Sequence, residues 1–223
     1  MTRCGIRGAR GVMIGLVVLL GMLGVAGPVS ALLIQVDFTG IVGIVGSGLA
    51  GGPINVDDAV SGSFIYDTDT VDEMAGPGDG LYNAVLSFDA TVGSYVATAT
   101  GLTGFRVMDD APSIPSPFDA VFVNASGNVS GAPINGFAPD RLQWALDSTD
   151  LTKLLSDALP DIAGLQAFVA SDGDVNLNFL TFGALDRQVR WNLTSFSVVP
   201  VPEPGTAMLL GLGLAGLAAL HRP

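Results

Sequence analysis

The stretch Tyr82-Asn-Ala-Val-Leu-Ser-Phe-Asp-Ala90 alternates in character from one residue to the next. The alternation sets two groups of side chains against each other, Ala84, Leu86 and Phe88 against Val85, Ser87 and Asp89. Because successive side chains of a strand point to opposite faces, a period of two predicts a β-strand with one buried face. Residues 82–90 therefore favour an all-β domain.

Similar segments lie on both sides of this stretch. The expected strands are residues 32–40, 59–66, 91–100, 102–108, 118–124, 141–146, 175–182 and 189–198. The segments between them are rich in Gly, Pro and Asp, which favour turns. Short strands separated by turn signals predict a single β-sandwich or jelly-roll-like domain.

One segment, residues 150–159, has a different period. Its apolar residues fall on one face of a helix: Leu151, Leu154, Leu155, Ala158 and Leu159. Asp150 can cap the N-terminus of such a helix, and Pro160 would end it. The sequence therefore predicts one short inserted helix in the all-β domain.

The N-terminus has the pattern of a secretory signal peptide. A segment with three arginines precedes an uncharged apolar stretch, residues 11–27, and small residues follow up to Ala31. This order predicts a signal helix over residues 1–31 that is cut after Ala31. An uncleaved membrane anchor is the alternative. The single cysteine, Cys4, lies in this segment, so the exported domain would hold neither a disulfide nor a thiol nucleophile.

The predicted exported domain, residues 32–199, is strongly acidic. It contains twenty Asp and Glu residues but only five Lys and Arg. Such a charge repels nucleic acid, so we expect no nucleic-acid partner. The only histidine, His221, lies outside the domain, which excludes a Ser-His-Asp triad and a His-ligated metal within it. We therefore expect no catalytic triad and no histidine-bound metal in the domain. Apart from calcium, we expect no cofactor.

Two acidic turns are candidate calcium sites. Their carboxylates alternate along the chain and could converge on a hard cation: Asp67, Asp69, Asp72 and Glu73 in the first turn, Asp172 and Asp174 in the second. A solvated turn is the alternative for each. The adjacent acids Asp109-Asp110 and Asp57-Asp58 are expected to face water.

Two other chemistries remain open for the domain. A pair of carboxylates could hydrolyse a glycan, but twenty scattered acids do not identify the pair. An exposed aromatic ring could bind sugar, although each ring is also a candidate for the core: Tyr66, Tyr82, Tyr95, Trp144 and Trp191.

The C-terminal segment, residues 200–223, has the features of a sorting tail. Val201-Pro-Glu-Pro204 precedes an apolar run to Leu220, and Arg222 follows. A helix from residue 205 to residue 220 would be about 24 Å long at ~1.5 Å per residue, against a hydrocarbon core of about 30 Å. This length suits a transient stop in the membrane better than a permanent span.

These residues resemble the PEP-CTERM sorting signal of exported proteins from Gram-negative bacteria. The resemblance rests on the sorting motif Val201, Pro202, Glu203 and Pro204, the apolar run, and Arg222. It implies that the secretion machinery exports the protein and that an exosortase, a membrane-embedded protease, recognises and removes the tail. Family tails usually end in several arginines, whereas this chain ends His221-Arg222-Pro223.

The resemblance also implies a location and a general role. We expect a transient association with the inner membrane through the C-terminal hydrophobic helix, and then a place at the cell surface or in the extracellular matrix. The family's processed proteins are associated with extracellular polysaccharide and biofilm matrix. This favours a non-enzymatic structural or polysaccharide-associated protein, with a carboxylate-based glycan hydrolase or a calcium-stabilised adhesion module as alternatives.

Overall fold

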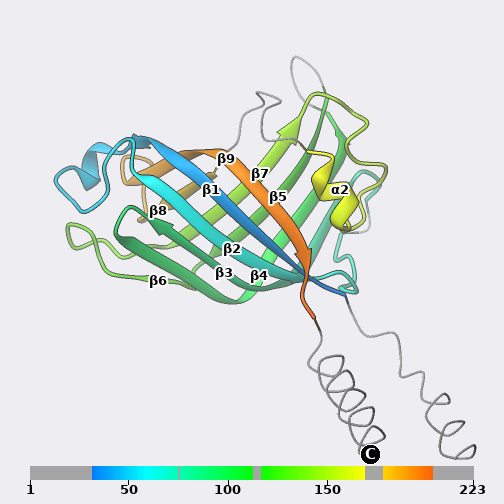
Figure 1. Cartoon of the computed structure of the whole chain (residues 1–223), viewed down its shortest axis with the longest axis horizontal. Helices are drawn as coiled ribbons and strands as arrows, with labels where there is room; N and C mark the ends of the chain where they lie inside the picture. The colour runs from blue at the N-terminus through cyan, green and yellow to red at the C-terminus, as the bar shows by residue number, and fades with distance from the viewer. Residues whose placement is uncertain (1–31, 75, 113–116, 169–177, 203–223) are drawn as a thin grey trace, which may run out of the picture. The chain divides into compact units, whose positions relative to one another are not determined.

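The computed structural model describes residues 32–74, 76–112, 117–168 and 178–202, and these residues form an all-β domain (Figure 1). Its elements in chain order are β1 (Leu33–Val45), η1 (Ser47–Leu49), β2 (Ala59–Asp67), β3 (Asp79–Val92), β4 (Tyr95–Ala111), β5 (Phe118–Ser126), β6 (Val129–Gly131), β7 (Arg141–Ser148), α2 (Ile162–Gln166), β8 (Asn178–Thr181) and β9 (Gln188–Pro200). The predicted signal helix and the predicted C-terminal hydrophobic helix lie outside these residues. Within the described part of the chain, no helix is long and apolar enough to span a membrane.

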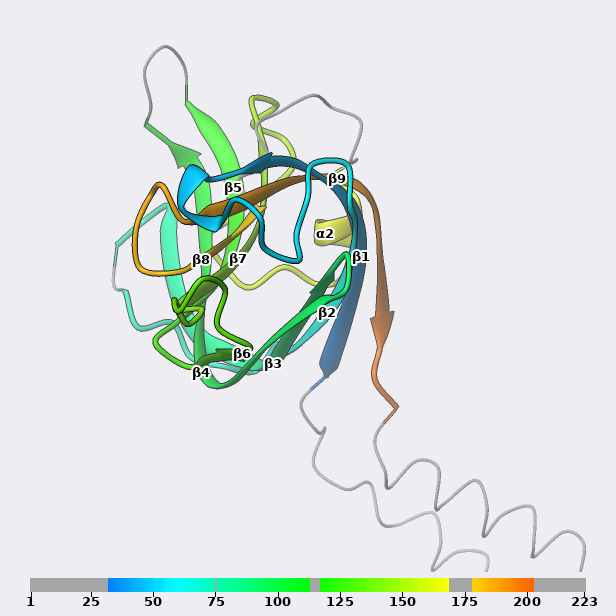
Figure 2. The same ribbon diagram turned by 90° about the vertical axis from the view of Figure 1, so that its left-hand side faces the viewer.

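Eight of the strands form a closed antiparallel β-barrel. Apart from the short β6, each strand pairs with the next one along the chain, and β9 pairs with β1 to close the ring (Figure 2). β6 lies outside this ring and pairs with β4. The predicted sandwich or jelly roll is therefore wrong. The difference depends on the pairing of the first and last strands, which local patterns along the chain do not reveal.

Most of the predicted strands are present. Residues 59–66 and 82–90 lie within β2 and β3, and the alternation in residues 82–90 runs through most of β3. The predicted strand over residues 91–100 is wrong at its start, because residues 91–92 end β3 and residues 93–94 form a turn. The rest of it continues through Gly101 into the predicted strand 102–108 as one long strand, β4. The predicted strand over residues 175–182 corresponds to β8, which begins at Asn178. Residues 175–177 lie outside the described part of the chain.

The predicted helix over residues 150–159 is wrong. Residues 151–158 form turns and bends, and the helix of this region, α2, begins only after Asp161. Asp161 caps α2, because its side chain accepts a hydrogen bond from the backbone N–H of Gly164 at 2.8 Å. The backbone N–H of Leu154 donates to the side chain of Asp119 in β5. Tertiary hydrogen bonding thus competes with the helical pattern.

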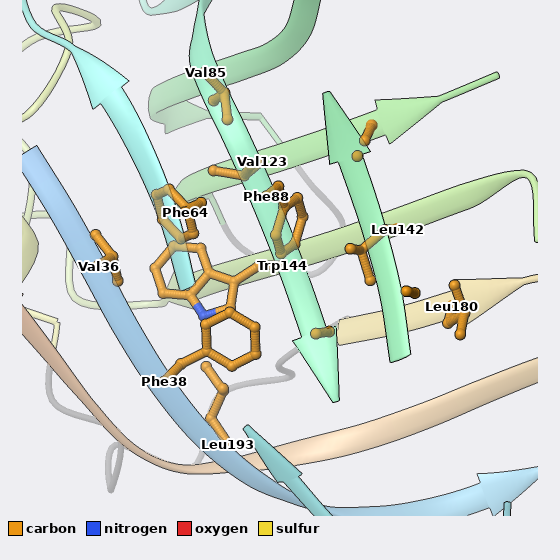
Figure 3. Packing of buried hydrophobic residues seen from close by; sticks show 14 of the residues in the cluster. Val36, Phe38, Phe64, Val85, Phe88, Val123, Leu142, Trp144, Leu180 and Leu193 are labelled. Atoms are coloured by element: carbon orange, nitrogen blue, oxygen red, sulfur yellow. The ribbon is translucent and has the colours of Figure 1, made fainter. Parts of the chain in front are cut away.

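Aromatic side chains fill the inside of the barrel. The rings of Phe64 and Trp144 lie 4.9 Å apart between centroids, and Phe64 and Phe88 lie 5.8 Å apart with an edge-on geometry (Figure 3). The five aromatic residues considered for sugar binding are all buried: Tyr66, Tyr82, Tyr95, Trp144 and Trp191. None of these five rings therefore offers an exposed stacking platform.

Two inward-facing glycines make room for this packing. A Cβ atom at Gly40 would lie 2.6 Å from the carbonyl oxygen of Asn192 and 3.0 Å from Cδ1 of Trp191. A Cβ atom at Gly62 would overlap the ring of Phe38. Both positions lack a side chain because neighbouring groups already occupy the space.

Candidate functional site

One end of the barrel collects most of the acidic side chains. At this acidic end β1, β3 and β5 begin, and β2, β4, β7 and β9 end. Its acidic residues among the described ones are Asp67, Asp69, Asp72, Glu73, Asp79, Asp109, Asp110, Asp119, Asp147, Asp150, Asp157 and Asp161. The antiparallel order of the strands brings these residues together from loops that are far apart in the sequence.

Two cations lie among these acids within the described residues. Arg106 donates from Nε to Oδ1 of Asp79 at 2.8 Å, and this hydrogen bonding lowers the pKa of Asp79. Lys153 lies 3.6 Å from Asp150. The acidic end therefore remains strongly negative after both ion pairs are counted.

The cap segment, residues 149–168, packs against the acidic end. The hydroxyl group of Tyr66 donates to the carbonyl oxygen of Pro160 at 2.7 Å, and that of Tyr82 donates to the carbonyl oxygen of Asp157 at 2.8 Å. The cap segment buries three apolar side chains, Leu154, Leu165 and Phe168. Burial raises the pKa of Tyr66 far above its usual value, and the charge of Asp161 raises it further. Tyr66 is therefore a neutral donor that holds the cap segment.

Three carboxylates converge beneath the cap segment. Oxygen atoms of Asp109, Asp110 and Asp119 all lie within 4.8 Å of one another. Asp119 is fully buried, and its two oxygens accept the backbone N–H groups of Asp110 at 3.0 Å and of Leu154 at 2.9 Å. Partial burial raises the pKa of Asp109, and the charges of Asp119, Asp110 and Asp157 raise it further. A divalent cation would relieve this repulsion, and carboxylate oxygens are the ligands that calcium prefers.

The acids predicted to bind calcium are engaged differently. Asp67 accepts the backbone N–H of Asp69, and Oδ1 of Asp72 accepts those of Met74 and Leu81. Glu73 accepts a hydrogen bond from Asn83. Among the described residues, the only group of at least three acids with converging oxygens is the one around Asp119. The second predicted set, Asp172 and Asp174, lies outside the described residues, as do Ala31, Glu203, Pro204 and Arg222.

Sequence reasoning missed the role of Asp119. The adjacent pair Asp109-Asp110 is visible in the sequence, which predicts that both side chains face water. Its partner Asp119 belongs to the next strand, and the β4–β5 pairing brings the two segments together.

A second polar surface lies on the outside of the barrel, across β3, β2, β1 and β9. Small polar side chains face outward in two rows that the strand register brings side by side. This hydroxyl face comprises Asp37, Thr39, Ser61, Ser63, Asp89, Ser195 and Ser197, and these residues border a hollow of about 460 Å³. The hydroxyl of Ser63 donates to Asp89 at 2.9 Å, and Gln35 donates to Asp37 at 2.7 Å.

The two ends of the domain meet at the acidic end. Ile34 near the start of β1 pairs with Pro200 at the end of β9. The backbone N–H of Val201 donates to the carbonyl oxygen of Leu33 at 2.8 Å. The described chain therefore leaves the barrel at Pro202, directly beside its first strand.

The described chain is thus a closed antiparallel β-barrel whose last strand leads directly into the C-terminal segment. A family model described as the PEP-CTERM protein-sorting motif matches residues 200–222. The resemblance drawn from the tail is thereby confirmed: the protein carries a PEP-CTERM motif, which implies export, processing by exosortase, and membrane-associated sorting to the cell surface. No curated protein and no solved structure matches the chain.

Proposed function

We propose that the barrel is a non-enzymatic module that is displayed at the cell surface or in the extracellular matrix and associates with polysaccharide through its hydroxyl face. The observation that carries the proposal is the hollow bordered by hydroxyl and carboxylate groups on β1, β2, β3 and β9. The side chains of this face form rows of hydrogen-bond donors and acceptors on the outside of the barrel. The PEP-CTERM motif supports the location, since it directs the protein to the cell surface.

The lining of the hollow indicates the kind of glycan. Asp37 and Asp89 are acceptors for sugar hydroxyl groups, and Ser61, Ser63 and Ser195 can both donate and accept. No lysine or arginine borders the hollow, so an anionic polysaccharide would meet uncompensated negative charge. We therefore expect a neutral, hydroxyl-rich polysaccharide.

Sedimentation of the purified barrel with neutral and with anionic matrix polysaccharides tests this proposal. The double variant Asp37→Ala/Asp89→Ala should lose at least tenfold in affinity for the neutral polysaccharide. A matched control, Asp69→Ala/Asp186→Ala, removes two exposed acids elsewhere and should bind as the wild type does. Equal binding by both variants, or binding of the anionic polysaccharide alone, would contradict the proposal.

A second candidate function is calcium-stabilised adhesion at the acidic end. The specific observation is the convergence of Asp109, Asp110 and Asp119 within 4.8 Å, next to the cap segment. A cation there would join β4 and β5 and, through Asp119, the cap segment. Bound calcium would then fix the loops that form this end.

A further inference from the structure

The sorting motif begins inside the folded barrel. Its match starts at residue 200, and Pro200 is the last residue of β9, paired with Ile34 of β1. The next residue, Val201, is tied to Leu33 by the backbone hydrogen bond of 2.8 Å. Among the described residues of the motif, Pro202 alone lies beyond this strand pairing.

We propose that this pairing gates the processing of the tail: the end of β9, residues 199–201, must separate from β1 before exosortase can cut. Proteases bind their substrates in an extended form and use the backbone N–H and C=O groups on both sides of the cut. In the closed ladder the N–H of Val201 is occupied by Leu33, and β1 lies against one edge of the segment. The opened segment offers that edge to the protease.

The end of β9 is built so that it can open while the barrel stays folded. The last core residue of β9 is Val198, which is 5% exposed, whereas Val199 is 43% exposed. Pro200 has no backbone N–H and so cannot donate to β1. Residues 199–201 are themselves not buried in the core, so their separation from β1 withdraws no buried side chain of β9 and breaks few hydrogen bonds. Segments of this kind open locally at far lower cost than the whole domain unfolds.

The β1–β9 pairing also makes processing of the tail depend on whether the barrel has closed. The β1–β9 pairing is the one that joins the first and last strands of the ring. A chain that has not yet closed its barrel presents an open motif, whereas the folded barrel presents it only when the strand end separates. The rate of processing then reports how often residues 199–201 leave β1. This inference rests on the sorting motif and is independent of any polysaccharide binding.

A disulfide lock tests the gate. Leu33→Cys/Val201→Cys places two cysteines opposite each other at the end of the ladder, and Ile41→Cys/Asn192→Cys joins the same two strands at an inner pair outside the hydroxyl face. Both variants are made in the full chain with Cys4→Ser, and the intact masses of cell-bound and released protein are followed in a host with a matching exosortase. The masses also show whether the disulfide has formed.

We expect the oxidised end lock to slow removal of the tail at least tenfold and the inner lock to leave it unchanged. Reduction of the disulfide should restore processing. A flexible Gly-Ser linker of about six residues, inserted between Val201 and Pro202, should rescue the locked protein because it moves the motif away from the ladder. Processing of the oxidised end lock at the wild-type rate would overturn the proposal. So would a failure of the linker to rescue a locked protein whose disulfide is verified.

Discussion

Oδ2 of Asp119 accepts the backbone N–H of Leu154 at 2.9 Å, and this bond joins the start of β5 to the middle of the cap segment. Oδ1 of the same carboxylate accepts the backbone N–H of Asp110 at the end of β4. One fully buried side chain thus holds the end of β4 and the cap segment together at the acidic end. The hydrogen-bonding capacity of Asp119 explains why a carboxylate is tolerated there, since buried polar groups need partners.

Replacement of Asp119 by alanine should destabilise the domain. The substitution leaves the N–H groups of Asp110 and Leu154 without their acceptor, and we expect a loss of about 2–4 kcal/mol for two such groups. Urea unfolding measures the change as a lower midpoint with an unchanged slope. The control Asp69→Ala, at an exposed position of the same end, should change the midpoint little. Equal effects of the two substitutions would contradict the assigned role of Asp119.

Tyr66→Phe should weaken the attachment of the cap segment. It removes the buried donor of the carbonyl oxygen of Pro160, so we expect a loss of about 1–3 kcal/mol in the free energy of unfolding. Tyr95→Phe is the matched comparison. It removes a hydrogen bond to the carbonyl oxygen of Ala132, a partly buried site where water can replace the donor. Tyr66→Phe should therefore have the larger effect, and the reverse order would count against this role for Tyr66.

Asp109→Asn should stabilise the calcium-free domain at neutral pH, by no more than about 1 kcal/mol because solvent screens this partly exposed group. The pKa of Asp109 is raised from its ordinary value of 3.8, so its ionised form is less favourable in the folded than in the unfolded state. This destabilisation is complete above the folded-state pKa and fades as the pH falls toward 3.8. Thermal melts from pH 7 to pH 3 should show the advantage of the variant shrinking to zero. A stability advantage of Asp109→Asn that grows as the pH falls would contradict this prediction.

Millimolar calcium should raise the melting temperature of the wild-type domain. A ligand that binds only the folded state at a hundred times its Kd adds about 2.7 kcal/mol. Asp109→Asn should abolish most of the shift if the cation binds beside Asp119. Loss of the shift in Asp67→Ala/Asp69→Ala instead would locate the ion at the first acidic turn. A wild-type protein that shows no shift would contradict calcium binding at either place.

Gly62→Ala should be strongly destabilising. A Cβ atom there would overlap the ring of Phe38 and the carbonyl group of Asp89, and overpacking of this kind typically costs about 1–3 kcal/mol. Gly76→Ala is the control, because no neighbouring atom lies within 4 Å of its added Cβ atom. Chemical unfolding of both variants measures the difference. A neutral Gly62→Ala would mean that the ring of Phe38 can move aside.

Much of this protein could be predicted from local patterns. The alternation in residues 82–90 predicted a strand, and the all-β class follows from several segments of the same kind. The sorting motif is a contiguous stretch, so it was recognisable without a fold. The apolar spacing of residues 150–159 was misleading, because the hydrogen bond from Leu154 to Asp119 replaces a helical one. That partner lies in β5, outside any local window of the sequence.

The strand-rich class, the acidic charge and the sorting route follow from the amino-acid sequence, because each depends on neighbouring residues or on composition. Closure of the strands into a barrel does not follow from it, since closure depends on the pairing of β1 with β9 across the whole domain. The same long-range pairings bring Asp119 to Asp109 and Pro200 to Ile34. Alternation specifies which face of a strand is buried but not which strand lies beside it.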